Sequence, residues 1–183
     1  MRRLVKLLVL IPLLLVGLTV AGVGVLFLRS DVVSFQPRLP EMRRMIEAQR
    51  AATPALPLFF RRCMHAEGVP DHHTARCLLA KHGLDDTTSL RRHARAFSWG
   101  ASLWLHFSAE ERDLLYCACV NDGAGKAGIH QVSRRLFGRP VEELTERELA
   151  ALVVASRAPF RFLIHRPLWD LSTERLLHQV KGG

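Results

Sequence analysis

An uncharged apolar run near the N-terminus constrains the fold of this chain more than any other feature. Residues 7–28 are 22 consecutive positions without a charge, and the basic segment MRRLVK precedes them. At about 1.5 Å per residue, a helix of this length crosses the hydrocarbon core of a bilayer. A cleaved signal peptide is the alternative, because a basic head, an apolar middle and the small residues of TVAG share its outline. The run continues through VGVLFL, and this length favours a retained, single membrane-spanning helix.

The remaining sequence predicts one helical domain that follows the membrane segment. Residues 1–29 form the anchor, residues 30–56 a proline-containing juxtamembrane segment with one helix, and residues 57–183 a domain large enough for a core. Apolar residues recur at helical spacing throughout, and no run has the alternation of a strand. We therefore predict an all-α fold.

The net charge of +9 suits anionic lipid, a phosphate-bearing substrate or nucleic acid, although a solvated basic surface is the simpler interpretation. The basic residues are scattered without interleaved aromatic residues, which argues against nucleic acid as a partner. Basic residues also flank the apolar run on both sides, so charge alone does not assign a side of the membrane to the domain.

Local signals predict where several helices begin and end. Ser108 with Glu111, and Thr145 with Glu148, have the Ser/Thr-x-x-Glu spacing of a capping box at a helix start. Gly138 is expected to end a helix that begins at residue 129. Before Ser108 lies a longer helix with an apolar stripe that we expect to pack on the core. That stripe consists of Leu90, Ala94, Phe97, Ala101 and Trp104.

The four cysteines permit disulfides, but buried free thiols are the preferred interpretation. These residues are Cys63, Cys77, Cys117 and Cys119. The segment CMHAEGVPDHHTARC also offers conceivable metal ligands, namely Cys63, His65, His72, His73 and Cys77. Their spacing matches no ordinary zinc pattern, and we predict no metal site there.

One segment carries a resemblance to a known family. Residues 127–159 read AGIHQVSRRLFGRPVEELTERELAALVVASRAP. This resembles glycosyltransferase family 51, the peptidoglycan transglycosylases, in which Tyr-Gly-x-x-x-Ala-Ala-x-x-Tyr-Phe-Gly-Lys leads into Glu-Leu-Thr-x-x-Glu and then Ala-Pro. The matching positions are Gly128, Phe137, Gly138, Leu144, Thr145, Glu148 and Pro159. Upstream, ERDLLYCACVN, RRHAR and TARCLLAKH lie where that family has three further motifs.

The resemblance implies a lysozyme-like helical domain anchored in the bacterial inner membrane by one pass, with the domain on the periplasmic side. It implies lipid-linked peptidoglycan precursor or a glycan strand as ligand, and other cell-wall proteins as further partners. In that family one Glu removes the proton of an acceptor hydroxyl, a second Glu supports the site, and basic residues with a divalent metal handle the pyrophosphate. A carboxylate base and nearby cations are what this chemistry needs.

The matching of individual residues is incomplete. Glu67 stands nearest to the first catalytic Glu, and its position makes it the candidate general base. The second Glu corresponds to Arg95, and the Glu of a third motif corresponds to Cys117. The positions expected to bind the substrate's phosphates or to support the site are Lys81, Arg91, Arg92, Arg112 and Asn121.

These replacements predict a catalytically impaired relative that binds a lipid-linked glycan or a partner and needs no cofactor. Two alternatives stay open. The first is a minimal active transglycosylase that uses Glu67 as its base, with a divalent metal as a further requirement. The second is a basic scaffold at the membrane surface, unrelated to glycan chemistry. The three differ in whether Glu67 shares a cleft with Lys81, Arg91 and Arg92.

Overall fold

The structure of the chain is a computed structural model that describes residues 2–53, 55–84, 88–120 and 128–182. All of the regular secondary structure in these ranges is helical, and none of it is strand, so the predicted all-α class is confirmed. The chain divides into two compact units, Met1–Leu39 and Pro40–Gly183, and each is described by itself. This division falls within the segment 30–56 that the sequence sets apart as a juxtamembrane linker.

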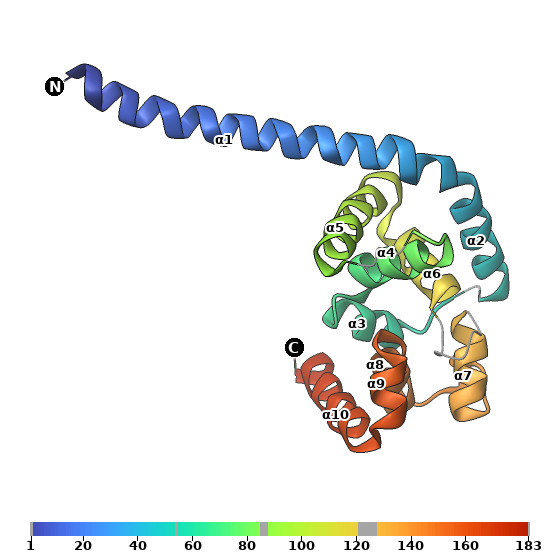
Figure 1. The fold of residues 1–183 in the computed structure, drawn as a ribbon. Coiled ribbons are helices and arrows are strands. Elements are labelled where there is room, and N and C mark those ends of the chain that lie inside the picture. The colour runs from blue at the N-terminus through green and yellow to red at the C-terminus, as the bar shows by residue number, and fades with distance from the viewer. Residues whose placement is uncertain (1, 54, 85–87, 121–127, 183) are drawn as a thin grey trace. The chain divides into compact units, whose positions relative to one another are not determined.

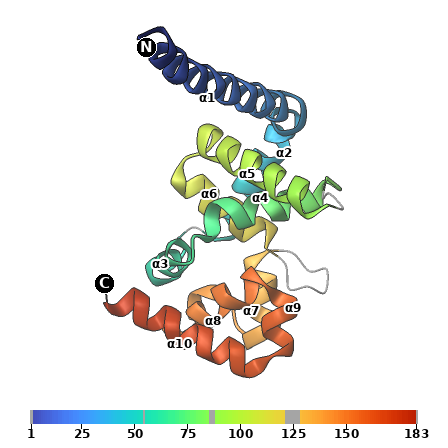
Figure 2. The same cartoon turned by 60° about the vertical axis from the view of Figure 1, so that its left-hand side comes forward.

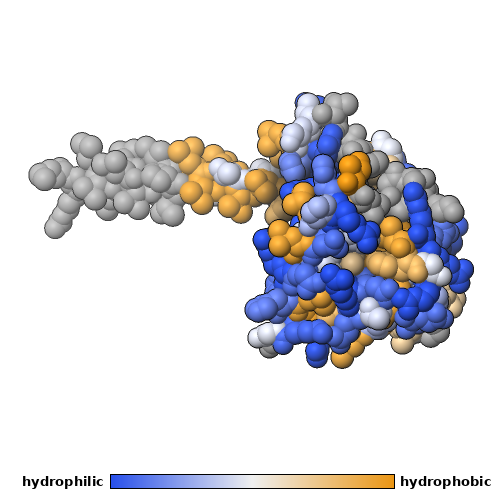
Figure 3. Space-filling model, turned by 90° about the horizontal axis from the view of Figure 1, so that it is seen from below, coloured by the Kyte–Doolittle hydropathy of each residue, from blue (hydrophilic) through white to orange (hydrophobic). Residues whose placement is uncertain are grey.

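The first unit is dominated by one long helix, α1 (Arg2–Ser30), which continues into the short turns η1 (Asp31–Phe35) and η2 (Gln36–Arg38). Leu14, Leu18 and Leu26 each expose more than half of their side chain. In Figure 3 the described side chains of this helix form a nearly continuous hydrophobic surface. The helix is long and apolar enough to span a membrane.

The second unit contains nine α-helices among the residues that the structure describes. They are α2 (Leu39–Ala52), α3 (Leu58–Ala66), α4 (Val69–Lys81), α5 (Ser89–His106), α6 (Ala109–Cys119), α7 (Ile129–Phe137), α8 (Glu146–Arg157), α9 (Pro159–Ile164) and α10 (Arg166–Gly182). A short 3-10 turn, η3 (Val141–Glu143), connects α7 to α8.

The helices of this unit pack in two groups. In the first, α4 lies between α5 and α6 and contacts both (Figure 1). In the second, α3, α8 and α10 contact one another, and Figure 2 shows α7 and α9 beside them. The hydrophobic core cluster belongs mainly to the second group and includes Phe60, Tyr116, Leu152 and Trp169. Helix α3 joins the groups, because it contacts α4 as well as α8 and α10.

The predicted helix boundaries are confirmed at the sites where local chemistry is strongest. Ser108 Oγ accepts a hydrogen bond from the Glu111 amide at 3.2 Å, and the Glu111 carboxylate accepts one from the Ser108 amide at 2.8 Å. Thr145 and Glu148 form the same reciprocal pair, at 3.3 and 2.9 Å. Gly138 ends α7 with φ +72°, a left-handed conformation that glycine adopts without steric cost.

Replacing Thr145 with alanine should destabilise the domain by about 1 kcal/mol, because the Glu148 amide loses its side-chain acceptor. Thermal unfolding of the full chain in detergent measures this loss. Thr88→Ala is the matched control, since Thr88 begins α5 but its side chain accepts no capping hydrogen bond. Equal melting temperatures for both variants would show that the Thr145 cap does not stabilise α8.

The expectation that the apolar stripe of α5 packs on the core is wrong. Leu90, Phe97 and Trp104 are 82%, 75% and 69% exposed. The face that packs against the neighbouring helices consists instead of Ala96, Trp99, Ser102 and Leu103. Because both faces of α5 are apolar, helical spacing alone did not distinguish the buried face from the exposed one.

Candidate functional site

Glu67 lies at the C-terminal end of α3, where its backbone amide donates to the Cys63 carbonyl at 3.1 Å. Its carboxylate accepts a hydrogen bond from the guanidinium of Arg157, which lies 90 residues away at the end of α8. The Glu67 side chain is 17% exposed and that of Arg157 is 34% exposed. The candidate base is therefore already paired with a cation, and an acceptor hydroxyl would have to compete with this arginine for the carboxylate.

The charge of Arg157 also acts on a histidine of α4. Burial, together with the charges of His72, Arg157 and Arg76, lowers the pKa of His73 to about 4. His73 is consequently neutral at pH 7. We call the ion pair of Glu67 and Arg157 the Glu67 cluster.

The lowered pKa of His73 predicts a loss of stability in acid. As the pH falls from about 6.5 to about 4, His73 of the unfolded chain takes up a proton while His73 of the folded chain stays neutral. The free energy of unfolding should therefore fall in this window. Denaturant unfolding at pH 7 and pH 5 measures it. His73→Gln should lose less stability between these two values than the wild type.

The control for this pH effect is His178→Gln, because His178 is exposed near the end of α10. It should lose as much stability as the wild type over the same interval. A His73→Gln variant with an unchanged pH dependence would contradict the proposed role of His73.

Lys81 lies far from the Glu67 cluster. Glu67 precedes α4 and Lys81 ends it, so at 1.5 Å per residue the two are separated by about 20 Å along the helix. The Lys81 ammonium is 3.0 Å from the Glu41 carboxylate of α2. The hydrogen bond from Lys81 lowers the pKa of Glu41. Lys81 thus contributes to the α2–α4 contact.

The arginines of α5 occupy three different environments. Arg91 is exposed and forms no ion pair with the residues that the structure describes. Arg92 is half-buried. Arg95, which stands where the family has its supporting carboxylate, donates to the Leu84 carbonyl at 2.8 Å and so connects α5 to the segment that follows α4.

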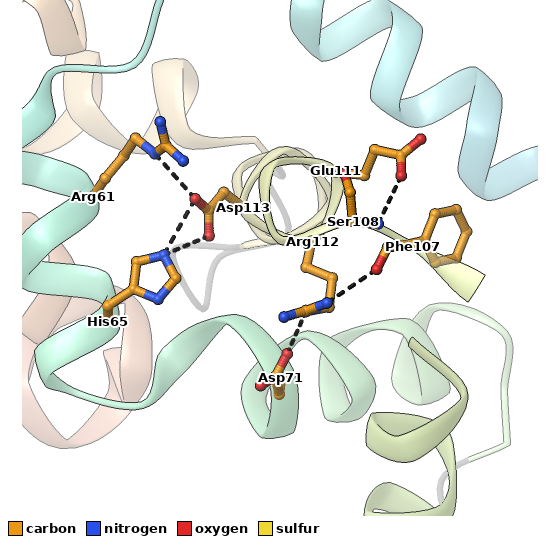
Figure 4. A network of polar contacts seen from close by, with 8 residues as sticks. All are labelled: Arg61, His65, Asp71, Phe107, Ser108, Glu111, Arg112 and Asp113. Carbon is orange, nitrogen blue, oxygen red and sulfur yellow. Dashed lines mark hydrogen bonds and ion pairs between the residues drawn. The ribbon is translucent and has the colours of Figure 1, made fainter. Parts of the chain in front are cut away.

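Arg112 is engaged between α6 and α4 (Figure 4). Its Nε lies 2.7 Å from a carboxylate oxygen of Asp71, and its Nη1 donates to the Phe107 carbonyl at 2.9 Å. Only 14% of its side chain is exposed. This arginine holds α6 against α4 and turns no free charge toward solvent. The last predicted ligand, Asn121, lies outside the described residues.

The next residue on α6 forms a second polar contact, which the sequence analysis missed. Asp113 is 1% exposed, and its carboxylate lies 3.1 Å from Arg61 Nε and 3.1 Å from His65 Nε2, both on α3 (Figure 4). The ERDLL segment shows that α6 carries charged residues. That its Asp113 is buried in the core becomes clear only when its partners on α3 are known. Asp113 joins the two groups of helices.

The position of Cys117 also departs from the resemblance. Cys117 is fully buried, and burial with the nearby Asp113 charge raises the pKa of its thiol. A residue in this place faces the core, so it does not line a cleft. All four cysteines are free, and three of them are buried as expected, whereas Cys77 is partly exposed. Among the described residues no group of three or more His, Cys, Asp or Glu side chains converges on a point where a metal would bind.

A hollow of about 350 Å³ lies elsewhere, between α7, α8 and α10. Phe137, Arg147, Arg166, Trp169 and Asp170 contribute to its wall, together with the Thr145 and Glu148 side chains that cap α8. The Arg166 guanidinium lies 4.1 Å from the centre of the Trp169 ring and covers it. None of the described residues that the sequence predicts as catalytic or substrate-binding line this hollow.

Among the described residues, the predicted catalytic Glu67 and the predicted ligands Lys81 and Arg112 are not brought together in one site. Glu67, Lys81 and Arg112 pair with three different partners, while Arg91 alone stays exposed and unpaired among the described residues. Fold and site together define an α-helical domain preceded by one helix that is able to span a membrane. Comparison of the chain with family models, with curated proteins and with solved structures finds no match in any of the three.

Proposed function

We propose that the chain is a membrane-anchored, non-catalytic relative of the family 51 glycosyltransferases that binds a pyrophosphate-linked glycan lipid in the bacterial cell envelope. The observation that carries the proposal is the pairing of Glu67 with Arg157. It occupies the one carboxylate that the resemblance offers as a base, while Arg95 and Cys117 replace two other family carboxylates. Without a free base, a sugar hydroxyl is a poor nucleophile.

The exposed basic end of α5 supports binding in place of catalysis. Arg91 offers a guanidinium that no described carboxylate neutralises, and such a group donates well to a phosphate. The ligand class follows from the resemblance, and so do a lysozyme-like arrangement of the domain and its periplasmic position at the inner membrane. Helix α1 supports the anchor by its length and apolar composition.

A single assay separates this proposal from the active alternative. Purified full chain in detergent is mixed with labelled lipid-linked disaccharide and scored for both polymer and bound ligand. We expect no polymer, and binding that weakens as salt rises. Arg91→Glu should lower the affinity roughly tenfold, the effect of losing a charge-assisted hydrogen bond of about 1.5 kcal/mol. Glu67→Gln should leave the affinity unchanged.

Arg134→Glu is the matched control, because Arg134 is exposed on α7 and the substitution changes the net charge equally. Its affinity should stay at the wild-type value. Polymer that disappears in Glu67→Gln would establish the minimal-enzyme alternative. Absence of binding by the wild type would favour a scaffold unrelated to glycan chemistry.

A further inference from the structure

Helix α5 carries an exposed apolar surface that runs along most of its length. We call this surface the α5 stripe, and it consists of Leu90, Ala94, Phe97, Ala101, Trp104 and Leu105. Leu90, Phe97 and Trp104 are seven residues apart, so they follow one line along the helix with a drift of only about 20° per step. Their exposure of 82%, 75% and 69% makes the stripe a contiguous hydrophobic patch. A patch of this kind marks a surface with a partner.

The charge of α5 restricts what that partner is. The helix contains three arginines and two histidines and no acidic residue. At its N-terminal end, the exposed side chains of Arg91 and His93 lie on opposite edges of the stripe, about 90° and 70° from its centre line at 100° per residue. An apolar face bordered by an exposed arginine, on a helix without acidic residues, is complementary to a bilayer that contains anionic lipid.

A second copy of the chain fits this surface less well. Pairing α5 with its own counterpart would place two basic helices without acidic residues against each other, and the like charges would repel. A bilayer is also bound to be nearby if α1 spans it, because the same polypeptide continues into the domain.

We propose that the α5 stripe lies in the interfacial region of the membrane, with the helix parallel to the bilayer plane. Leu90 and Leu105 are about 22 Å apart along the helix, and the apolar side chains reach into the boundary of headgroups and acyl chains. Trp104 is suited to that depth, because its indole is apolar and carries one hydrogen-bond donor. This proposal rests on the exposure and charge of α5 and holds whether or not a glycan lipid binds.

Trp104 also provides the test, since the other two tryptophans, Trp99 and Trp169, are 0% and 3% exposed. The full chain is placed, one copy per disc, in nanodiscs of phosphatidylcholine and phosphatidylglycerol without glycan lipid. Tryptophan emission is compared with and without bromine on the acyl chains, and with and without iodide in the water. Wild type minus Trp104→Phe gives the emission of Trp104.

We expect brominated lipid to remove most of the Trp104 emission and iodide to remove little. Leu90→Ser with Phe97→Ser, two exposed substitutions, should shift the quenching from brominated lipid to iodide. Quenching of wild-type Trp104 by iodide alone would overturn the proposal, since the stripe would then face water. Protection from both quenchers would overturn it too, because another segment of the chain would then cover the stripe.

Discussion

Trp99→Ala is expected to destabilise the domain by about 3–5 kcal/mol, the usual cost of removing a large aromatic side chain from a packed core. Trp99 is fully buried on α5, on the side that packs against α4, and its ring centre lies 6.1 Å from that of His82. For a unit of this size the loss corresponds to a fall of roughly 10–15 °C in the melting temperature. Thermal unfolding of the full chain in detergent micelles measures it.

Trp104→Ala is the matched control for this prediction. It removes the same side chain from the same helix, five residues later and about 140° around the axis. Because Trp104 is 69% exposed, its loss should change the stability by no more than about 0.5 kcal/mol. If Trp104→Ala destabilised the domain more than Trp99→Ala, α5 would pack on the core through the α5 stripe, as the helical spacing predicts.

This contrast on α5 shows what the sequence can and cannot predict. Some features depend only on contacts within four residues, so they can be predicted from the sequence. These are the capping boxes at Ser108 and Thr145 and the helix end at Gly138. The face of α5 that is buried depends on α4 and α6, which supply the neighbours. Where both faces of a helix are apolar, tertiary contacts determine which face is buried. In α5 they leave the larger side chains of Leu90, Phe97 and Trp104 exposed.

The candidate site was harder to predict for the same reason. Glu67 was identifiable as a carboxylate at a helix end, but Arg157, its partner, lies 90 residues later in the chain. A family resemblance assigns a role to each position separately and does not predict new side-chain partners of that position. It therefore placed Arg112 among the phosphate-binding residues, whereas the structure uses that arginine to hold Asp71 across the α4–α6 contact.

The contact around Asp113 gives the second large effect, and the effect depends on which partner is removed. Arg61 and His65 are 40% and 50% exposed, whereas the Asp113 carboxylate is 1% exposed. Removing Asp113 allows Arg61 and His65 to turn toward water. Removing both of these partners leaves a buried carboxylate with no ion-pair partner, which costs more free energy of folding. Arg61→Met with His65→Phe should therefore cost about 3–5 kcal/mol, and Asp113→Asn about 1–2 kcal/mol.

The triple substitution makes this argument testable, because the costs should not add. Introducing Asp113→Asn into the Arg61→Met, His65→Phe chain neutralises the isolated charge and should restore part of its stability. Denaturant unfolding of the three variants at pH 7 measures the coupling. A triple variant less stable than the Arg61→Met, His65→Phe chain would show that packing of the arginine and histidine side chains, and not charge, accounts for the loss. The predicted recovery would instead identify the Asp113 charge, held by α3, as the reason why α6 needs both partners.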